Sequence, residues 1–300
     1  MTRIAVLGRI PASGLELLRQ AGDVWAWDHD EHIPDDVRDE QLATADAAVT
    51  LLTNKVDVAA CERRGVVVTN TPGVLADATA DLAMALILML TRRLGEGERL
   101  IRSGEPWAWG MFMMLGTGIQ GRQLGIIGMG GIGEALAARA RAFGMQVVYH
   151  NRRPVAPELA AHLDAERLEL DDLLATSDIV SVNCPYNADT HHLIDAVALA
   201  RMKSSAFLVN TARGPIVDEA ALADALRSGL IAGAALDVFE NEPQVHPGLL
   251  DLDNAVLVPH LGSATVETRG AMAELAARNV VEVLAGHDPL TPVTPPPATA

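Results

Sequence analysis

The chain has 300 residues, of which 49% are hydrophobic and 21% are charged, and its formal net charge is −16. This is an ordinary globular composition, and the length suggests two domains. A strongly acidic chain gains nothing from the counterion release that drives nucleic-acid binding, so we expect no nucleic-acid partner.

The cysteines and the apolar segments limit the cellular setting. Cys61 and Cys184 have neither disulfide-framework nor metal-type spacing, which fits a reducing compartment and predicts no metal site. Residues 1–10 lack the long apolar stretch of a signal peptide. The most apolar segment, 82–90, is far shorter than the roughly 18 residues of a membrane span. We therefore expect a cytoplasmic protein with no membrane partner.

The N-terminal part of the chain alternates between strand and helix patterns. Strands are expected at 3–7, 23–27, 47–52 and 66–68, and helices at 11–21 and 36–42. This alternation predicts a small open α/β domain. A long helical pattern at 77–101 then forms a candidate bridge between domains. Residues 103–118 are rich in aromatic residues and methionine, and are either a packed loop or an arm covering a second subunit.

The clearest motif is a strand–helix–strand unit of about 30 residues. Its apolar strand, glycine-rich turn, alanine-rich helix and second strand lie at 124–127, 128–133, 134–143 and 145–149. In that context the spacing G-x-G-x-x-G is typical of dinucleotide binding, and a glycine-rich turn in an unrelated α/β protein is the alternative.

Each glycine of the motif has its own physical role. Gly128 permits the tight turn, Gly130 lets a pyrophosphate approach the backbone, and Gly133 lets the helix pack close to the strand. The helix N-terminus then offers free N–H groups to the phosphates. We predict that the whole turn binds the cofactor, including the residues between these glycines, Met129, Gly131 and Ile132.

The end of the second strand of this unit distinguishes NAD from NADP. An NAD site usually carries Asp or Glu about 20 residues after the glycines, where the carboxylate binds the ribose 2′-hydroxyl. Here the sequence is His150-Asn151-Arg152-Arg153, without a carboxylate. A guanidinium offers a charge-assisted fork to a 2′-phosphate, so we predict NADP(H) over NAD(H). The alternative is that both arginines are ordinary surface charges.

Strand and helix patterns continue to residue 259, and three polar side chains follow predicted strand ends. They are Arg213, Asp237 and His260, and Glu242 comes shortly after the second. Ligands of open α/β sheets bind beyond the carboxyl ends of the strands. Hydride reduction of a 2-oxo acid needs a cation for the carboxylate, a general acid for the carbonyl oxygen, and a carboxylate that orients this acid. Arg213, His260 and Glu242 can supply these functions, although singly each could be an ordinary surface or loop residue.

Several longer segments resemble the D-isomer-specific 2-hydroxyacid dehydrogenase family, most closely its glyoxylate/hydroxypyruvate reductase branch. They are NTPGVLADATADLA, LGIIGMGGIG, YHNRRP, LVNTARGPIVDEAAL, GAALDVFENEP and VPHLGSAT. The resemblance covers nearly the whole chain, in the family's order. It implies an α/β fold of two doubly wound parallel-sheet domains, with the cofactor in the cleft. A Rossmann-type nucleotide domain would span 97–266, and a flavodoxin-like substrate domain would comprise 1–96 and 267–300.

The resemblance also implies roles for individual residues. Arg213, Glu242 and His260 would be the substrate arginine, the supporting glutamate and the proton donor, and Asp237 would face the nicotinamide carboxamide. Ser263 and Trp109 would contact substrate, and Trp109 matches an aromatic that reaches the neighbouring subunit's active site. A homodimer through the 103–118 arm is therefore expected. The remaining residues expected at the cofactor are Thr79, Cys184, Pro185, Thr211, Ala212 and Gly262.

The sequence departs from the family pattern near residues 56–57. The family has a further strand and a substrate-binding loop there, whereas Thr53-Asn54-Lys55-Val56 runs directly into Asp57. About 25 residues have no counterpart, on the usual lengths of such elements. A real deletion would remove a central strand, and the other explanation is that this sequence lacks residues of the natural chain.

Two other functions remain compatible with the sequence. One is a family dehydrogenase for another substrate, such as 2-ketogluconate or phosphite. The other is a non-catalytic NAD(P)-sensing binding protein, which would keep the cofactor cleft.

Overall fold

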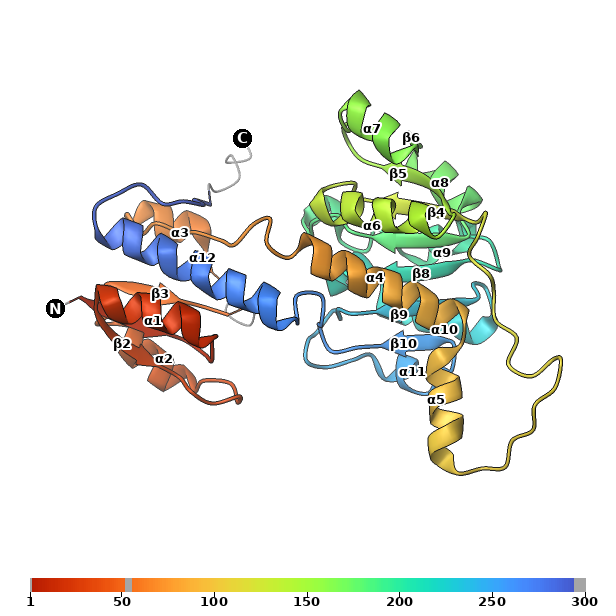
Figure 1. The fold of residues 1–300 in the computed structure, drawn as a ribbon, viewed down its shortest axis with the longest axis horizontal. Coiled ribbons are helices and arrows are strands. Elements are labelled where there is room, and N and C mark those ends of the chain that lie inside the picture. The colour runs from red at the N-terminus through yellow and green to blue at the C-terminus, as the bar shows by residue number, and fades with distance from the viewer. Residues whose placement is uncertain (1, 52–55, 294–300) are drawn as a thin grey trace. The chain divides into compact units, whose positions relative to one another are not determined.

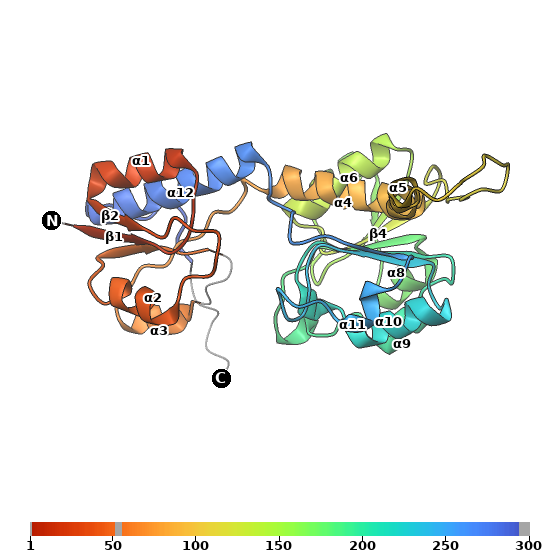
Figure 2. The ribbon, with the colours of Figure 1, turned by 90° about the horizontal axis from the view of Figure 1, so that it is seen from below.

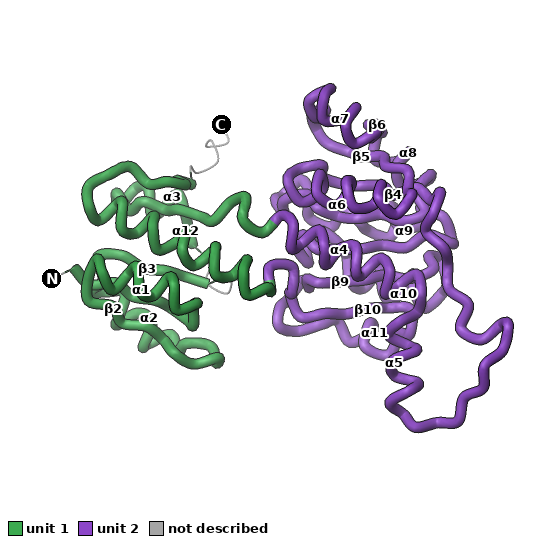
Figure 3. The backbone as a smooth tube through the Cα atoms, in the orientation of Figure 1, with its two compact units in different colours: residues 1–75, 264–300 green, residues 76–263 purple. Residues whose placement is uncertain are grey.

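The computed structural model describes residues 2–51 and 56–293 and divides into two compact units. Unit 1 comprises residues 1–75 and 264–300, and unit 2 comprises residues 76–263 (Figure 3). Both are α/β with parallel strands, which confirms the predicted fold class. The sequence placed the first boundary after residue 96, whereas residues 76–96 pack with unit 2. Thr53-Asn54-Lys55, next to the expected interruption of the family pattern, lies outside the described residues.

Unit 1 is built on a three-stranded parallel sheet with the order β2-β1-β3 (Figure 1). Helices α1 and α12 lie side by side on one face, where Gly14 allows α1 to approach Ala273 closely, and α2 lies on the other face (Figure 2). The elements are β1 (Arg3–Val6), α1 (Ala12–Ala21), β2 (Asp23–Ala26), α2 (Asp35–Leu42), β3 (Ala47–Val49), α3 (Val58–Arg63) and α12 (Val266–Leu284).

Two predictions for the first part of the chain were wrong. The strand expected at 66–68 is absent from the described residues, because Val66 and Val67 are about half exposed and pair with no strand. Instead, Val68 accepts a hydrogen bond from the N–H of Val293. The single helix expected at 77–101 is two helices, α4 (Ala76–Thr91) and α5 (Leu94–Ser103). Arg93 separates them with a left-handed backbone at φ 56° and binds Glu96 through its side chain.

Unit 2 is a seven-stranded parallel sheet with the order β10-β9-β8-β7-β4-β5-β6. Hydrophobic clusters fill both faces, with α4 and α6 over one face and α8, α9 and α10 over the other (Figure 2). The strands are β4 (Gln123–Ile127), β5 (Gln146–His150), β6 (Ala165–Arg167), β7 (Ile179–Val182), β8 (Phe207–Asn210), β9 (Gly233–Leu236) and β10 (Ala255–Leu257). The remaining helices are α6 (Gly131–Ala142), α7 (Pro157–Leu163), α8 (Leu170–Thr176), α9 (Ala196–Arg201), α10 (Glu219–Ser228) and α11 (Pro247–Leu250), with short 3₁₀ turns η1 (Ala188–Thr190) and η2 (Gly214–Ile216).

The strand order of unit 2 fixes where a ligand can bind. The chain runs from β4 outward to β5 and β6, then returns to β7 on the other side of β4. The carboxyl ends of β4 and β7, on either side of this reversal, are the usual ligand position in such sheets. Within the described residues, no helix is long and apolar enough to cross a membrane.

Candidate functional site

The glycine-rich turn lies at this reversal of strand order, between the end of β4 and the start of α6. Gly128 has φ 99°, and a Cβ there would lie 2.4 Å from the backbone nitrogen of Cys184, so only glycine fits. A Cβ on Gly133 would lie 2.5 Å from the carbonyl oxygen of Gly128. A Cβ on Gly130 would meet nothing within 4 Å. Two glycines therefore serve the packing of the turn, while the backbone at Gly130 is open to a ligand, as a dinucleotide cofactor requires.

The end of β5 supports the turn and presents two free cations. Asn151 accepts a hydrogen bond from the N–H of Met129 at 2.7 Å and donates to the Met129 carbonyl at 3.2 Å. Asn151 therefore fixes the glycine turn, and the Met129 side chain lies in the core. Arg152 and Arg153 are exposed, and neither forms an ion pair or side-chain hydrogen bond with another described residue. Their guanidinium groups are available to an anionic ligand.

The segment after β7 lies against the glycine-rich turn, and the segment after β8 contacts the segment after β7. The Thr211 hydroxyl is buried and donates to the Asn183 side-chain oxygen at 3.4 Å. Burial raises the pKa of the neighbouring Cys184 thiol to about 11, although the positive charge of Arg152 opposes the shift. A thiol with this pKa stays protonated at neutral pH and is a poor nucleophile. Ala212 is buried beside Thr211, and Pro185 is exposed.

His260 and Glu242 form a hydrogen-bonded pair after the last two strands. The Nδ1 of His260 lies 2.9 Å from Oε2 of Glu242, and the other Glu242 oxygen accepts from the N–H of Phe239 at 3.0 Å. This places the Nδ1 proton toward the carboxylate and leaves Nε2 with no partner among the described residues. The His260 side chain is 26% exposed, so Nε2 is accessible to a small molecule. The pair can deliver a proton.

Asp237 holds the turn that carries His260. Its two oxygens accept from the N–H groups of Leu261 at 2.5 Å and Gly262 at 2.9 Å, and its own carbonyl accepts from His260 N–H at 2.9 Å. Burial raises the pKa of this 1% exposed carboxyl, while the two N–H groups oppose the shift. Asp237 therefore fixes the backbone of the turn 260–262. The sequence resemblance assigned Asp237 to the nicotinamide and did not predict this contact.

Two other predicted residues, Arg213 and Thr79, belong to segments that contact the Glu242 loop or the turn after His260. Arg213 precedes η2 and is exposed, and its turn packs so tightly that a Cβ on Gly214 would lie 1.9 Å from the Phe239 carbonyl carbon. The Arg213 turn and the Glu242 loop are thus in direct contact. Thr79, buried in α4, donates to the Gly262 carbonyl at 3.1 Å, and Ser263 follows that residue.

Trp109 is not brought to this group of residues within the chain. It is 78% exposed, and residues 104–118 loop away from the sheet of unit 2 (Figure 1). Sequence reasoning missed Glu219, a buried carboxylate beneath the Glu242 loop, and His192, which contacts Glu240. The only signal for Glu219 was its place in the segment that also carries Arg213.

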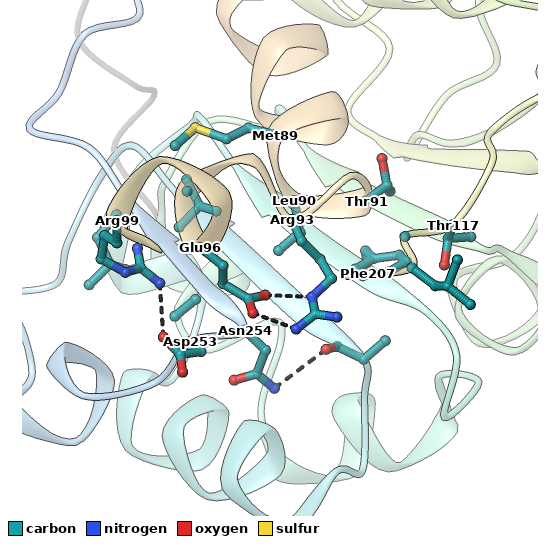
Figure 4. A pocket seen from close by; sticks show the side chains of 17 residues that line it. Met89, Leu90, Thr91, Arg93, Glu96, Arg99, Thr117, Phe207, Asp253 and Asn254 are labelled. Carbon is teal, nitrogen blue, oxygen red and sulfur yellow. Dashed lines mark hydrogen bonds and ion pairs between the residues drawn. The ribbon is translucent and has the colours of Figure 1, made fainter. Parts of the chain in front are cut away.

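A cavity of about 530 Å³ lies at the opposite edge of the unit 2 sheet (Figure 4). Phe207 and Ala232, at the amino ends of β8 and β9, line it. Its arginines are paired internally, Arg93 with Glu96 at 2.6 Å and Arg99 with Asp253 at 2.9 Å. The cavity lacks an unpaired cation and is remote from the carboxyl ends of the strands, so it is not the candidate site.

Comparisons with known proteins agree with the geometry. Residues 84–262 match the family model described as D-isomer specific 2-hydroxyacid dehydrogenase, NAD binding domain. A glyoxylate reductase from Thermococcus onnurineus is 42% identical over 318 aligned positions, covering 96% of this chain and 95% of the relative. One from Aeropyrum pernix is 43% identical, covering 96% and 94%.

Solved structures of reductases are also similar to this chain. A glyoxylate reductase from Paecilomyes thermophila superposes with a TM-score of 0.84 at 34% identity, covering 97% of this chain and 98% of that one. An NADPH-dependent glyoxylate/hydroxypyruvate reductase from Sinorhizobium meliloti, in complex with NADP and malonate, gives 0.80 at 33% identity, covering 98% and 97%.

Proposed function

Because this chain belongs to the D-isomer-specific 2-hydroxyacid dehydrogenase family, we propose that it reduces glyoxylate or hydroxypyruvate to the D-2-hydroxy acid with NADPH. The observation that carries the proposal is the His260–Glu242 pair, because its Nε2 has no partner among the described residues and the loop of Glu242 packs against the Arg213 turn. The relatives named glyoxylate reductase support the substrate class. Unit 2 is assigned to cofactor binding and unit 1 to the substrate domain.

The cofactor assignment depends on the turn and on the two free arginines. NADPH, when bound, supplies the hydride. The open backbone at Gly130 and the N-terminus of α6 would hold the pyrophosphate, and Arg152 and Arg153 would hold the 2′-phosphate. The preference for NADPH rests on these two side chains, and the Sinorhizobium meliloti relative is described as NADPH-dependent.

The chain's own residues perform the acid–base part of the reaction. The Arg213 guanidinium binds the carboxylate of the 2-oxo acid and polarises its carbonyl. As the carbonyl carbon accepts hydride, the carbonyl oxygen gains negative charge, and His260 donates the Nε2 proton to it. Glu242 keeps the Nδ1 proton in place, so that the imidazolium reacts only from Nε2. The product is the 2-hydroxy acid, and His260 is left neutral.

Replacing His260 tests the proposal. His260→Ala should lower the turnover of glyoxylate and hydroxypyruvate by about 10²- to 10⁴-fold, while NADPH binding, followed by nucleotide fluorescence, stays unchanged. His162→Ala, on the exposed part of α7, is the matched control. Retained turnover in His260→Ala would refute the assignment. If the wild type binds NADPH but turns over neither acid, the result would favour one of the two other functions. These are a dehydrogenase for 2-ketogluconate or phosphite, and a non-catalytic nucleotide sensor.

The 103–118 arm fits a homodimer. Its large apolar side chains are strongly exposed, and such patches mark interfaces; they are Trp107, Trp109, Met111, Phe112 and Leu115. Phe112→Asp is expected to convert a dimer into a monomer in sedimentation experiments, because a charge would enter the interface. An unchanged sedimentation coefficient would contradict this role of the arm.

A further inference from the structure

Glu219 is a buried carboxylate outside the predicted site, and its hydrogen bonds lead to that site. It is the first residue of α10 and is only 3% exposed. One oxygen accepts from the N–H of Glu240 at 2.6 Å, and the other accepts from the N–H of His246 at 3.1 Å. A single carboxylate therefore ties together both ends of the loop 240–246.

That loop carries the supporting carboxylate of the proposed proton donor. Glu242 lies within it and, among the described residues, receives hydrogen bonds only from Phe239 N–H and from Nδ1 of His260. The loop itself contains one internal bridge, between Asn241 and Gln244. Its position relative to His260 consequently depends on what fixes its two ends.

The loop is also in contact with the Arg213 turn. His192 extends this connection, because its Nε2 contacts the Glu240 side chain while its N–H donates to Pro215 at 2.9 Å. Gly214 packs against the peptide between Phe239 and Glu240. A shift of the loop ends would therefore disturb the residues proposed to hold both the substrate carboxylate and the proton.

We propose that Glu219 is a positioning residue, which keeps Glu242 on Nδ1 of His260 by binding both ends of the loop 240–246. This rests on the proposed function, because it assigns a task to the same acid–base pair. A carboxylate is required, since both oxygens accept from N–H donors. Glutamine would turn an N–H₂ group toward one of these donors and leave that end of the loop without an acceptor.

A double-mutant cycle separates positioning from a general structural role. Glu219→Gln should lower kcat about 10- to 100-fold and leave the KM for NADPH unchanged, and Glu242→Gln should do the same. If Glu219 acts through Glu242, the double variant is no slower than Glu242→Gln alone. Losses that multiply in the double variant would overturn the proposal. Glu158→Gln, an exposed carboxylate in the first turn of α7, is the matched control.

A second readout does not depend on turnover. Nitrogen-15 NMR of the His260 ring in the wild type should show the proton held on Nδ1, with mixed tautomers in both Glu219→Gln and Glu242→Gln. A ring unchanged by Glu219→Gln would refute positioning, whatever the enzyme's substrate proves to be. Absence of turnover in the wild type would instead count against the proposed function. If Glu219→Gln fails to fold, Glu219→Asp enters the same cycle, since it keeps the charge on a shorter side chain.

Discussion

The preference for NADPH can be tested through Arg152 and Arg153. Both side chains are exposed and unpaired within the described residues, so replacing them breaks no internal ion pair. A hydrogen bond to a charged group is worth about 1.5–3 kcal/mol, and exposure favours the lower value. About 1.4 kcal/mol corresponds to a tenfold change in affinity. Each single alanine variant should therefore lose about tenfold in kcat/KM for NADPH.

The assay is the loss of reduced-nicotinamide absorbance with hydroxypyruvate, measured separately with NADPH and NADH. The double variant should lose about 10- to 100-fold with NADPH, since neighbouring substitutions are not fully additive. Its kcat/KM with NADH should hardly change, because NADH lacks the 2′-phosphate. Arg278→Ala, another exposed arginine without a described partner, serves as the control. An equal loss with both nucleotides, or no loss with NADPH, would refute the arginine interpretation.

Three further predictions follow from local geometry. Gly128→Ala should abolish nucleotide binding measured by fluorescence, because its φ of 99° and the 2.4 Å approach to Cys184 leave no room for a methyl group. Gly214→Ala should lower the thermal midpoint and turnover together, because its Cβ would overlap the Phe239 carbonyl; a variant as stable and active as the wild type would contradict that packing. In a Cys61→Ala background, iodoacetamide should alkylate Cys184 at pH 8 about 100-fold more slowly than a free thiol, because a pKa of about 11 leaves little thiolate. The raised pKa also makes folding pH-dependent. The contribution of the Cys184 thiol to the free energy of unfolding is fully present below about pH 9, and it is lost as the pH rises through 11.

The sequence predicted the structure best where the structure depends on residues close together in the sequence. The strand–turn–helix–strand unit at 124–149 was predicted within a few residues, because apolar periodicity and glycine spacing are local signals. The break at Arg93 was missed although the sequence changes there, from the apolar residues at the end of α4 to the polar, glycine-containing start of α5. The strand expected at 66–68 failed because β propensity reflects packing against neighbours, and Val66 and Val67 have no strand beside them in the described residues.

The same distinction applies to the residues of the candidate site. Strand ends could be read from the sequence, so Arg213, Glu242 and His260 could be named before their contacts were known. Asp237 was also named, but for another role, and Glu219 was not named, because both carboxylates accept from backbone N–H groups that are near them only in the folded chain. A buried carboxylate and an exposed one look alike in a sequence, and burial gives these two their roles.

The sequence predicts that this chain departs from its relatives in unit 1, near residues 56–57. The alignment with the Thermococcus onnurineus reductase spans 318 positions but uses only 96% of 300 residues, so about 30 of its positions have no counterpart here. In the structure, β3 is an edge of the unit 1 sheet, with no strand of the described residues on its other side. This edge is the place where a further strand of the family pattern would pair.

The difference in size between the two sheets predicts uneven stability along the chain. The buried clusters of unit 1 are small, built around Ile4, Val6 and Leu18 on one face and Leu7 and Ile33 on the other, whereas large clusters fill both faces of unit 2. Local opening is easier where few apolar contacts are buried. Amide protons of β1 and β3 should therefore exchange with solvent about tenfold or more faster than those of β4, β7 and β8. Equal protection in the two sheets would contradict this prediction, and would show that contacts other than its own small core stabilise the three-stranded sheet.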